Sequence, residues 1–288
     1  MEDAKEEKRD MKKIYINADD FGFSHGINLA IFKGCHEGII NSTSIMMNQA
    51  GTDEAILLSK KMRNIDIGLH INLTNGYPVN AQSKVRNLVD KEGKFCCGFI
   101  KLMFRTMYLK EIRFQIWREI EAQIKAAIRS NIVLSHIDGH RHIQMIPLIY
   151  KITTRLQKKY TIGRLRIINE SILQTWKDQQ EIGGIRNGGI IKYFVLTFLR
   201  LLTRAKSNIY FFSIIYTGEM SSKVLKKVKI PNGYSGIEIM MHPGLPDVDK
   251  QNISSFSDKN IISKTRETEF LAILDKNCIK DMKNDKGL

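Results

Sequence analysis

Short apolar runs alternate along this chain with longer segments in which apolar residues recur at helical spacing. The short runs predict β-strands, and they cover residues 14–16, 42–47, 65–73, 132–134, 165–168 and 237–241. The longer segments predict helices at 26–37, 52–62, 111–129, 145–160 and 264–274. Strands that alternate with helices indicate an α/β protein with βαβ units and a parallel sheet, either open or closed into a barrel.

Ionisable side chains stand where several of these predicted strands end. Asp19 and Asp20 follow the first strand, His70 lies late in the strand 65–73, His140 follows 132–134, and His242 follows 237–241. The carboxyl ends of parallel strands meet at one edge of a sheet, where the chemistry of such folds collects. We therefore expect these side chains to converge on one site.

The segment 136–142, with the sequence HIDGHRH, gathers three imidazoles and one carboxylate. Imidazole nitrogen and carboxylate oxygen are the ligands that hold zinc and other first-row divalent ions. We take His140 as a candidate ligand and expect His136 and Asp138, which share one face of an extended chain, to orient it. His142 is expected to begin the next helix.

The remaining candidates each have a structural alternative. Two adjacent carboxylates repel each other unless a cation lies nearby, so one of Asp19 and Asp20 would bind a metal and leave the other as a base; alternatively, one caps the next helix. His70 alone would suit a core histidine, and it becomes a ligand only with partners from neighbouring strands. His242 precedes Pro243, which holds it extended as a fixed general acid, although it could be an ordinary turn residue.

Composition narrows the class of protein. With 288 residues, 43% of them hydrophobic, the chain can bury a large core. The net charge of +15 comes from lysines spread along the whole sequence, so we attribute it to composition bias and predict no nucleic-acid partner. Four cysteines without CxxC spacing, and an N-terminus without an apolar run, predict a cytoplasmic protein in a reducing compartment.

Four motifs in this order, NADDFG, GLHINLT, HIDGHRH and MMHPG, resemble the YdjC-like carbohydrate deacetylase family. That family includes chito-oligosaccharide deacetylases and hopanoid-associated relatives, and the resemblance runs from about residue 13 to residue 274. It implies a distorted TIM-like barrel of the polysaccharide-deacetylase type. It also implies removal of an N-acetyl group from an amino sugar, with an N-acetylated sugar as the substrate.

The resemblance also implies roles for individual residues. They are Asp20, His70 and His140 as metal ligands, Asp19 as general base, His242 as general acid, and Arg166 as the residue that steadies the base. The metal would be one divalent ion, magnesium by resemblance, with zinc or another first-row ion as the alternative. Another metal-assisted hydrolase, an amidohydrolase or phosphoesterase, is the competing function. A two-metal phosphoesterase would need more carboxylates than Asp19, Asp20 and Asp138 supply.

One segment departs from the family pattern. Residues 190–204 are unusually apolar, and 209–216 add more, so we expect a helical insert at about 186–218. It is too short to span a membrane. We favour an element that covers the barrel or forms a homodimer; the alternative is peripheral membrane contact through 190–216, with a lipid-linked glycan as the substrate. The domain limits are then a charged tail at 1–12, one barrel domain at 13–275 and a tail at 276–288.

Overall fold

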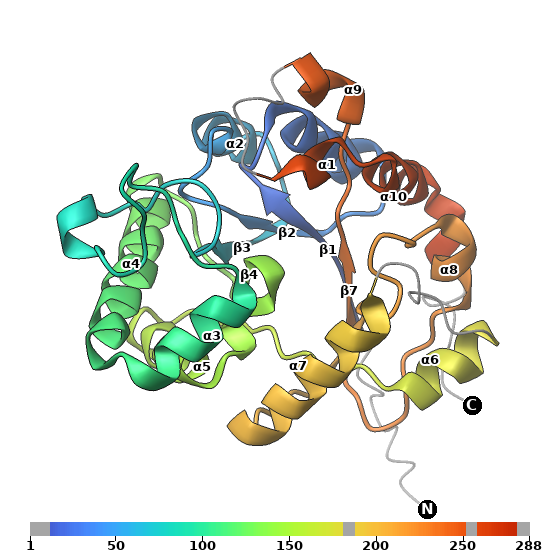
Figure 1. Ribbon diagram of the computed structural model, residues 1–288. Helices are drawn as coiled ribbons and strands as arrows, with labels where there is room; N and C mark the ends of the chain where they lie inside the picture. The colour runs from blue at the N-terminus through green and yellow to red at the C-terminus, as the bar shows by residue number, and fades with distance from the viewer. Residues whose placement is uncertain (1–11, 181–187, 252–257, 281–288) are drawn as a thin grey trace, which may run out of the picture.

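The structure is a computed structural model that describes residues 12–180, 188–251 and 258–280. Its centre is a seven-stranded parallel sheet in the order β5-β4-β3-β2-β1-β7-β6 (Figure 1). The strands are β1 (Lys13–Phe21), β2 (Ser42–Ile45), β3 (Asp66–Ile71), β4 (His136–Gly139), β5 (Arg164–Leu165), β6 (Ile209–Phe212) and β7 (Gly236–Met241). The predicted α/β fold with a parallel sheet is confirmed.

Helices surround this sheet (Figure 1). The α-helices are α1 (His25–Glu37), α2 (Thr52–Ser59), α3 (Phe99–Tyr108), α4 (Lys110–Arg129), α5 (Pro147–Lys159), α6 (Ile172–Gln179), α7 (Gly189–Thr203), α8 (Ser222–Lys227), α9 (Pro246–Asp249) and α10 (Lys264–Leu274). Short 3-10 helices are η1 (Gln82–Lys84), η2 (His140–Met145), η4 (Lys259–Ile262) and η5 (Lys276–Ile279). Sequence patterning located α1, α2, α4, α5 and α10.

The interior strands are buried on both faces, which is why they read as nearly continuous apolar runs. In β7 all six residues are buried, and β1 pairs with it in register from Lys13 opposite Gly236 to Ala18 opposite Met241. Gly236 is required there, because a Cβ atom would lie 2.3 Å from the Lys13 carbonyl oxygen. On the outside, α4 turns four isoleucines inward at i, i+4 spacing. The core thus fixes where the strands end.

One side chain links the two edges of the sheet by hydrogen bonds. Strand β5 has only two residues, and the chain that follows it runs beside β6. The Asn169 amide donates to the Ile209 carbonyl oxygen at 3.0 Å and accepts from the Phe211 N–H at 2.7 Å. The sheet is therefore curled, with Asn169 bridging β6 to the segment after β5.

Two predicted strands are misplaced. The strand expected at 132–134 is wrong: Val133 is 88% exposed, and the strand forms four residues later, from the histidine run itself. The strand expected at 165–168 ends at Leu165. Beyond it, Arg166 turns its side chain to the site, whereas Ile167 and Ile168 are buried in an apolar cluster. In the second of these places the apolar residues pack against Leu196 and Leu199 of α7 rather than pairing in the sheet.

The predicted helical insert at about 186–218 is also corrected. Its first half forms α7, but Ile209–Phe212 is the edge strand β6. The side chains of Tyr210, Phe212 and Tyr216 are buried, so these apolar residues of the second half pack into the core and are not available to a membrane. Among the described residues, no helix is both long enough and apolar enough to traverse a lipid bilayer.

The predicted tails are only partly visible. Residues 1–11 and 281–288 lie outside the described residues, and so does the start of the expected insert, residues 186–187. Within the predicted C-terminal tail, Lys276–Ile279 forms η5, and its Cys278 and Ile279 side chains are buried against the core.

Glu170, just after β5, gives the fold a pH-dependent stability. Its buried carboxylate accepts from the Ile214 N–H at 2.6 Å and from the Thr175 hydroxyl at 3.2 Å, and burial raises its pKa to about 7. A carboxyl whose pKa is higher in the folded state stabilises the fold below its unfolded pKa, and loses that contribution as pH rises through the folded pKa.

We expect the unfolding free energy of the wild type, relative to Glu170→Gln, to fall by about 1 kcal/mol per pH unit between about pH 5 and about pH 7. Urea unfolding at a series of pH values measures this difference. The matched control is Glu92→Gln, at an exposed loop glutamate. A Glu170→Gln difference that stays constant with pH would contradict the expectation.

Candidate metal centre

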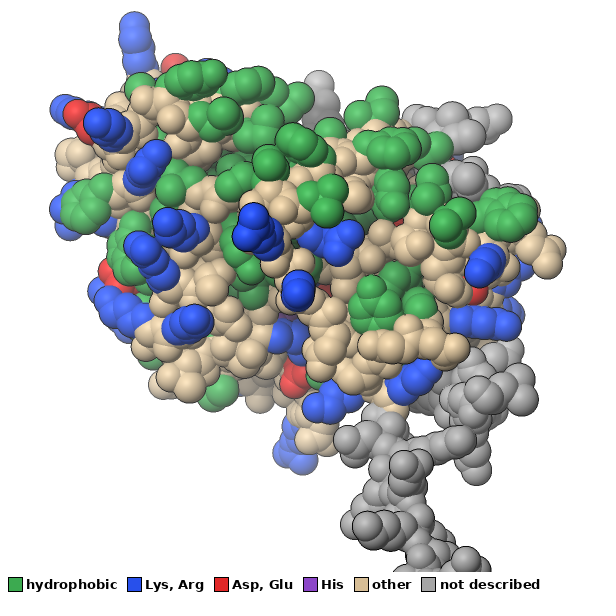
Figure 2. Space-filling model, turned by 90° about the horizontal axis from the view of Figure 1, so that it is seen from below, with side chains coloured by type: hydrophobic (Ala, Val, Ile, Leu, Met, Phe, Trp, Pro, Cys, Tyr) green, Lys and Arg blue, Asp and Glu red, His purple; other side chains and the backbone are tan. Residues whose placement is uncertain are grey.

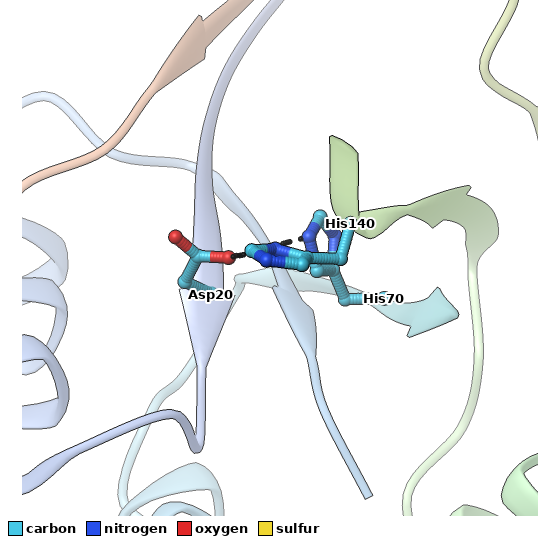
Figure 3. Close-up of side chains that lie close together, drawn as sticks. All are labelled: Asp20, His70 and His140. Carbon is cyan, nitrogen blue, oxygen red and sulfur yellow. Dashed lines mark hydrogen bonds and ion pairs between the residues drawn. The ribbon is translucent and has the colours of Figure 1, made fainter. Parts of the chain in front are cut away.

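Three side chains converge at the carboxyl edge of the sheet: Asp20 of β1, His70 of β3 and His140, which follows β4 at the start of η2. One oxygen of Asp20, Oδ1, lies 3.0 Å from His140 Nδ1 and 3.4 Å from His70 Nε2. One ligand atom from each residue lies within 4.8 Å of the others, and all three side chains are buried. Figure 3 shows the side chains pointing toward one another. The predicted convergence of these three residues is confirmed.

A distortion in β1 lets neighbouring aspartates serve one site. Successive residues of a regular strand face opposite sides of a sheet. Asp20 has φ of 71°, and the pairing of β1 with β2 shifts register between Ala18 and Phe21. Such a bulge re-aims a side chain, and a non-glycine residue in this region is strained. Asp19 and Asp20 both reach the site as a result.

Asp138 orients His70. Its Oδ1 lies 2.8 Å from His70 Nδ1, which leaves Nε2 toward Asp20. Burial alone would lower the pKa of His70, but the charges and hydrogen bonds of Asp138 and Asp20 raise it to about 10. The expectation that Asp138 and His136 orient His140 is therefore wrong: among the described contacts, Asp138 bonds His70 instead. His136 instead bonds Ser135 Oγ at 2.9 Å.

His140 has different neighbours. Its Nε2 lies 3.1 Å from the Asn75 amide, and Asn75 also donates to Asp258 at 3.2 Å. Arg141 forms an ion pair with the same carboxylate at 2.9 Å. Asn75, Asp258 and Arg141 thus form a polar layer over the imidazole that sequence reasoning did not identify.

Arg166 is fully buried and binds three carboxylates. It donates to both oxygens of Asp19, at 2.6 and 2.7 Å, and lies 2.7 Å from Asp138 and 2.6 Å from Glu238. Desolvation opposes its charge, but these anions raise the pKa of Arg166 above its ordinary value. The expected contact between Arg166 and Asp19 is present. It fixes the orientation of that carboxylate.

The same arginine decides between two possible sites. Asp19, His70 and Asp138 also place ligand atoms within 4.8 Å of one another. However, Arg166 already contacts both carboxylates of that group. A second cation there would face the guanidinium at close range, so the Asp20, His70 and His140 group is the better metal site.

His242 follows β7, and its backbone N–H donates to Glu269 at 2.5 Å. Burial is the main cause that lowers the pKa of His242 to about 4 and raises that of Glu269 to about 7. His242 is consequently neutral at pH 7. Glu269 comes from α10, a helix for which the sequence suggested no function.

Arg266, also on α10, completes the surroundings of Asp20. It donates to Oδ2 at 2.6 Å, so the other oxygen, Oδ1, remains directed to the imidazoles. Burial alone would raise the pKa of Asp20, but Arg266, followed by His140, lowers it well below its ordinary value. The only sequence signal for Arg266 and Glu269 was their place among buried positions of a predicted helix.

The donor set fits one divalent ion. Two imidazoles and one carboxylate, all buried, match the ligands of zinc and other first-row metals and leave coordination positions for water and substrate. Asp20 is held ionised and each of its oxygens has a separate partner. His70 and His140 are each oriented through their second ring nitrogen, as ligating histidines usually are.

Comparison with known proteins shows the family to which this chain belongs. A family model described as YdjC-like protein matches residues 13–284, so the chain belongs to the YdjC-like family, as its motifs predicted. A carbohydrate deacetylase of Thermoanaerobacter pseudethanolicus is 28% identical over 280 residues, covering 96% of this chain and 97% of that protein. One from Brevibacillus brevis is 34% identical over 150 residues, covering 52% of this chain and little more than half, 57%, of that protein.

Among solved structures, a proposed cellobiose-phosphate cleavage protein from Enterococcus faecalis V583 superposes with a TM-score of 0.70. It is 20% identical, and the match covers 94% of this chain and 95% of that one. At this identity the likeness concerns the fold alone.

Proposed function

We propose that this protein is a metal-dependent carbohydrate N-deacetylase that releases acetate and a free amine from an N-acetylated amino sugar. The observation that carries the proposal is the convergence of Asp20, His70 and His140 beside an aspartate held by a buried arginine. Family membership and relatives named carbohydrate deacetylase support the reaction class. A chito-oligosaccharide is the simplest substrate of this kind.

Asp20, His70 and His140 would hold the metal. The bound ion would polarise the acetamide carbonyl and lower the pKa of water from ~15.7 toward ~7. The two imidazoles favour zinc or another first-row ion over magnesium, which prefers oxygen ligands.

In the proposed reaction, Asp19 is the base that takes a proton from the attacking water. Arg166 holds its carboxylate by both oxygens, so the acceptor is fixed in direction. His242 is neutral at pH 7 and therefore gains a proton before it acts as an acid. In this proposal Asp19 passes that proton on to His242, and His242 delivers it to the amine nitrogen as the amide C–N bond breaks. Asp19 is then ionised again and His242 neutral again. Water and amide are consumed, and acetate and amine are formed.

A different metal-assisted hydrolase is the second candidate. A two-metal phosphoesterase needs carboxylates free to bridge a second ion. Asp19 and Asp138 are instead bound by Arg166, which argues for the single-metal deacetylase.

We also propose that residues 13–275 act as one domain in a reducing, cytoplasmic environment. The seven strands join one sheet, and all four cysteines are free thiols.

The test is acetate release from an N-acetylglucosamine oligomer by protein stripped with a chelator and then reloaded with zinc, manganese or magnesium. We expect activity only after reloading, and a loss of about 100- to 10,000-fold in Asp19→Asn, which retains the shape of the base but cannot take a proton. Asp53→Asn, at an exposed position of α2, is the control. Acetate release that persists without metal, or in Asp19→Asn, would contradict the assignment.

A further inference from the structure

Helices α3 and α7 each present an apolar stripe to solvent. On α7 the exposed side chains recur at helical spacing, and the largest exposed fractions among them are 72% for Ile191, 64% for Leu201 and 61% for Phe194. On α3 the stripe consists of Ile100, Phe104, Met107 and Tyr108. Isolated exposed apolar residues need no explanation, but contiguous stripes on two helices mark an interaction surface.

These two helices are neighbours. Phe99 and Met103 of α3 pack against the same buried cluster that contains Leu196 and Leu199 of α7. Figure 1 shows both helices on the same side of the sheet, in front of β4 and β7. Their exposed stripes therefore belong to one region of the surface, here called the α3–α7 surface.

The α3–α7 surface adjoins the metal centre. Arg141, the residue after the candidate ligand His140, lies near both helices: a Cβ atom on Gly98 would be 3.9 Å from its guanidinium. The pKa of Lys192 on α7 is lowered, first by partial burial and then by the charge of Arg141. A substrate bound over His140 would thus lie next to the first turns of α3 and α7.

The charges of this region are all positive. Residues 93–110 and 182–218 contain no aspartate or glutamate, whereas Lys101, Lys110, Lys192, Arg204 and Lys206 are exposed within them. On the face seen in Figure 2, hydrophobic side chains gather in a broad band bordered by Lys and Arg, and few acidic side chains are visible. Apolar stripes bordered by cations match the interface of an anionic bilayer. A second copy of the chain would bring like charges together.

We propose that the α3–α7 surface docks on an anionic lipid bilayer, so that the substrate is an amino sugar carried on a lipid. The apolar stripes would enter the headgroup boundary and the cations would contact lipid phosphates, which places the sugar headgroup beside Arg141 and the metal centre. The substrate class rests on the proposed deacetylase function; the docking does not.

The test is co-sedimentation of the full chain with vesicles of phosphatidylcholine containing phosphatidylglycerol, compared with phosphatidylcholine alone. We expect binding to the anionic vesicles that weakens with salt, and a loss of at least about tenfold in Phe194→Glu/Phe198→Glu, which places charge in the stripe. Leu57→Glu/Leu271→Glu is the matched control, because both side chains are 62% exposed on α2 and α10. Lys101→Gln/Lys206→Gln, which leaves the stripes intact, is expected to lose part of the salt-sensitive binding.

Absence of wild-type binding, or an equal loss in the control, overturns the docking. The docking is also overturned if light scattering shows that the wild type is a dimer, that Phe194→Glu/Phe198→Glu dissociates this dimer, and that no variant binds vesicles. Acetate release from a soluble N-acetylglucosamine oligomer is measured on the same samples. Full activity without vesicle binding removes only the docking, and binding without any acetate release removes only the deacetylase. Retained activity in Phe194→Glu/Phe198→Glu shows that this variant is folded.

Discussion

Arg166→Met is expected to lower the unfolding free energy by about 3–5 kcal/mol, a large share of the about 5–15 kcal/mol that keeps a typical domain folded. Methionine matches much of the side-chain volume but removes the charge that faces Asp19, Asp138 and Glu238. Those carboxylates would remain buried without their cation, and desolvated charge is what makes the loss large. Urea unfolding followed by circular dichroism measures it.

The matched control is Arg155→Met on the exposed face of α5, where the change should alter the free energy by less than about 0.5 kcal/mol. Arg166→Lys should recover only part of the loss, because an ammonium cannot bind both oxygens of Asp19 and reach Glu238 as well. If Arg166→Met were as stable as the wild type, the cluster of carboxylates would have to be protonated in the fold.

His70→Ala and His140→Ala are each expected to abolish stable metal binding. The wild type should hold about one ion per chain, and each variant should lose more than about 100-fold in affinity, since losing even a residue that only hydrogen-bonds to a ligand costs about 10- to 100-fold. Elemental analysis after dialysis gives the metal content. His36→Ala, at an exposed position of α1, should retain the wild-type stoichiometry.

The same measurement separates the two groups of candidate ligands. Loss of metal in Asp20→Asn identifies the Asp20, His70 and His140 site. Retention of metal in Asp20→Asn and in His140→Ala would contradict it and direct attention to Asp19, His70 and Asp138.

The parts of the site that the sequence could predict are those at strand ends. Asp20, His70 and His140 stand next to apolar runs, and the geometry of a parallel sheet brings such positions together. Arg266 and Glu269 could not be found in this way, because their function depends on how α10 packs against α1 and the end of β7. The spacing of apolar residues within one helix does not predict which residues of other elements its buried charged side chains will contact.

The misplaced strand at 132–134 has a similar cause. An isoleucine, a valine and a leucine in succession favour a strand by local propensity. The strand that joins the sheet is instead the more polar run 136–139, where Ile137 pairs opposite Leu69. Tertiary pairing outweighed local propensity there. Burial of His136 became possible because Gly68 leaves room for its ring: a Cβ atom would lie 2.3 Å from Nε2.

The left-handed conformation of Asp20 links two chemical tasks through a single peptide unit. The candidate ligand and the candidate base are consecutive residues, so any displacement of β1 carries both together, and their separation does not depend on the alignment of two independent elements. A substitution that let this position relax to ordinary extended geometry would turn one carboxylate away from its neighbour, and would uncouple proton transfer from metal binding without removing either group.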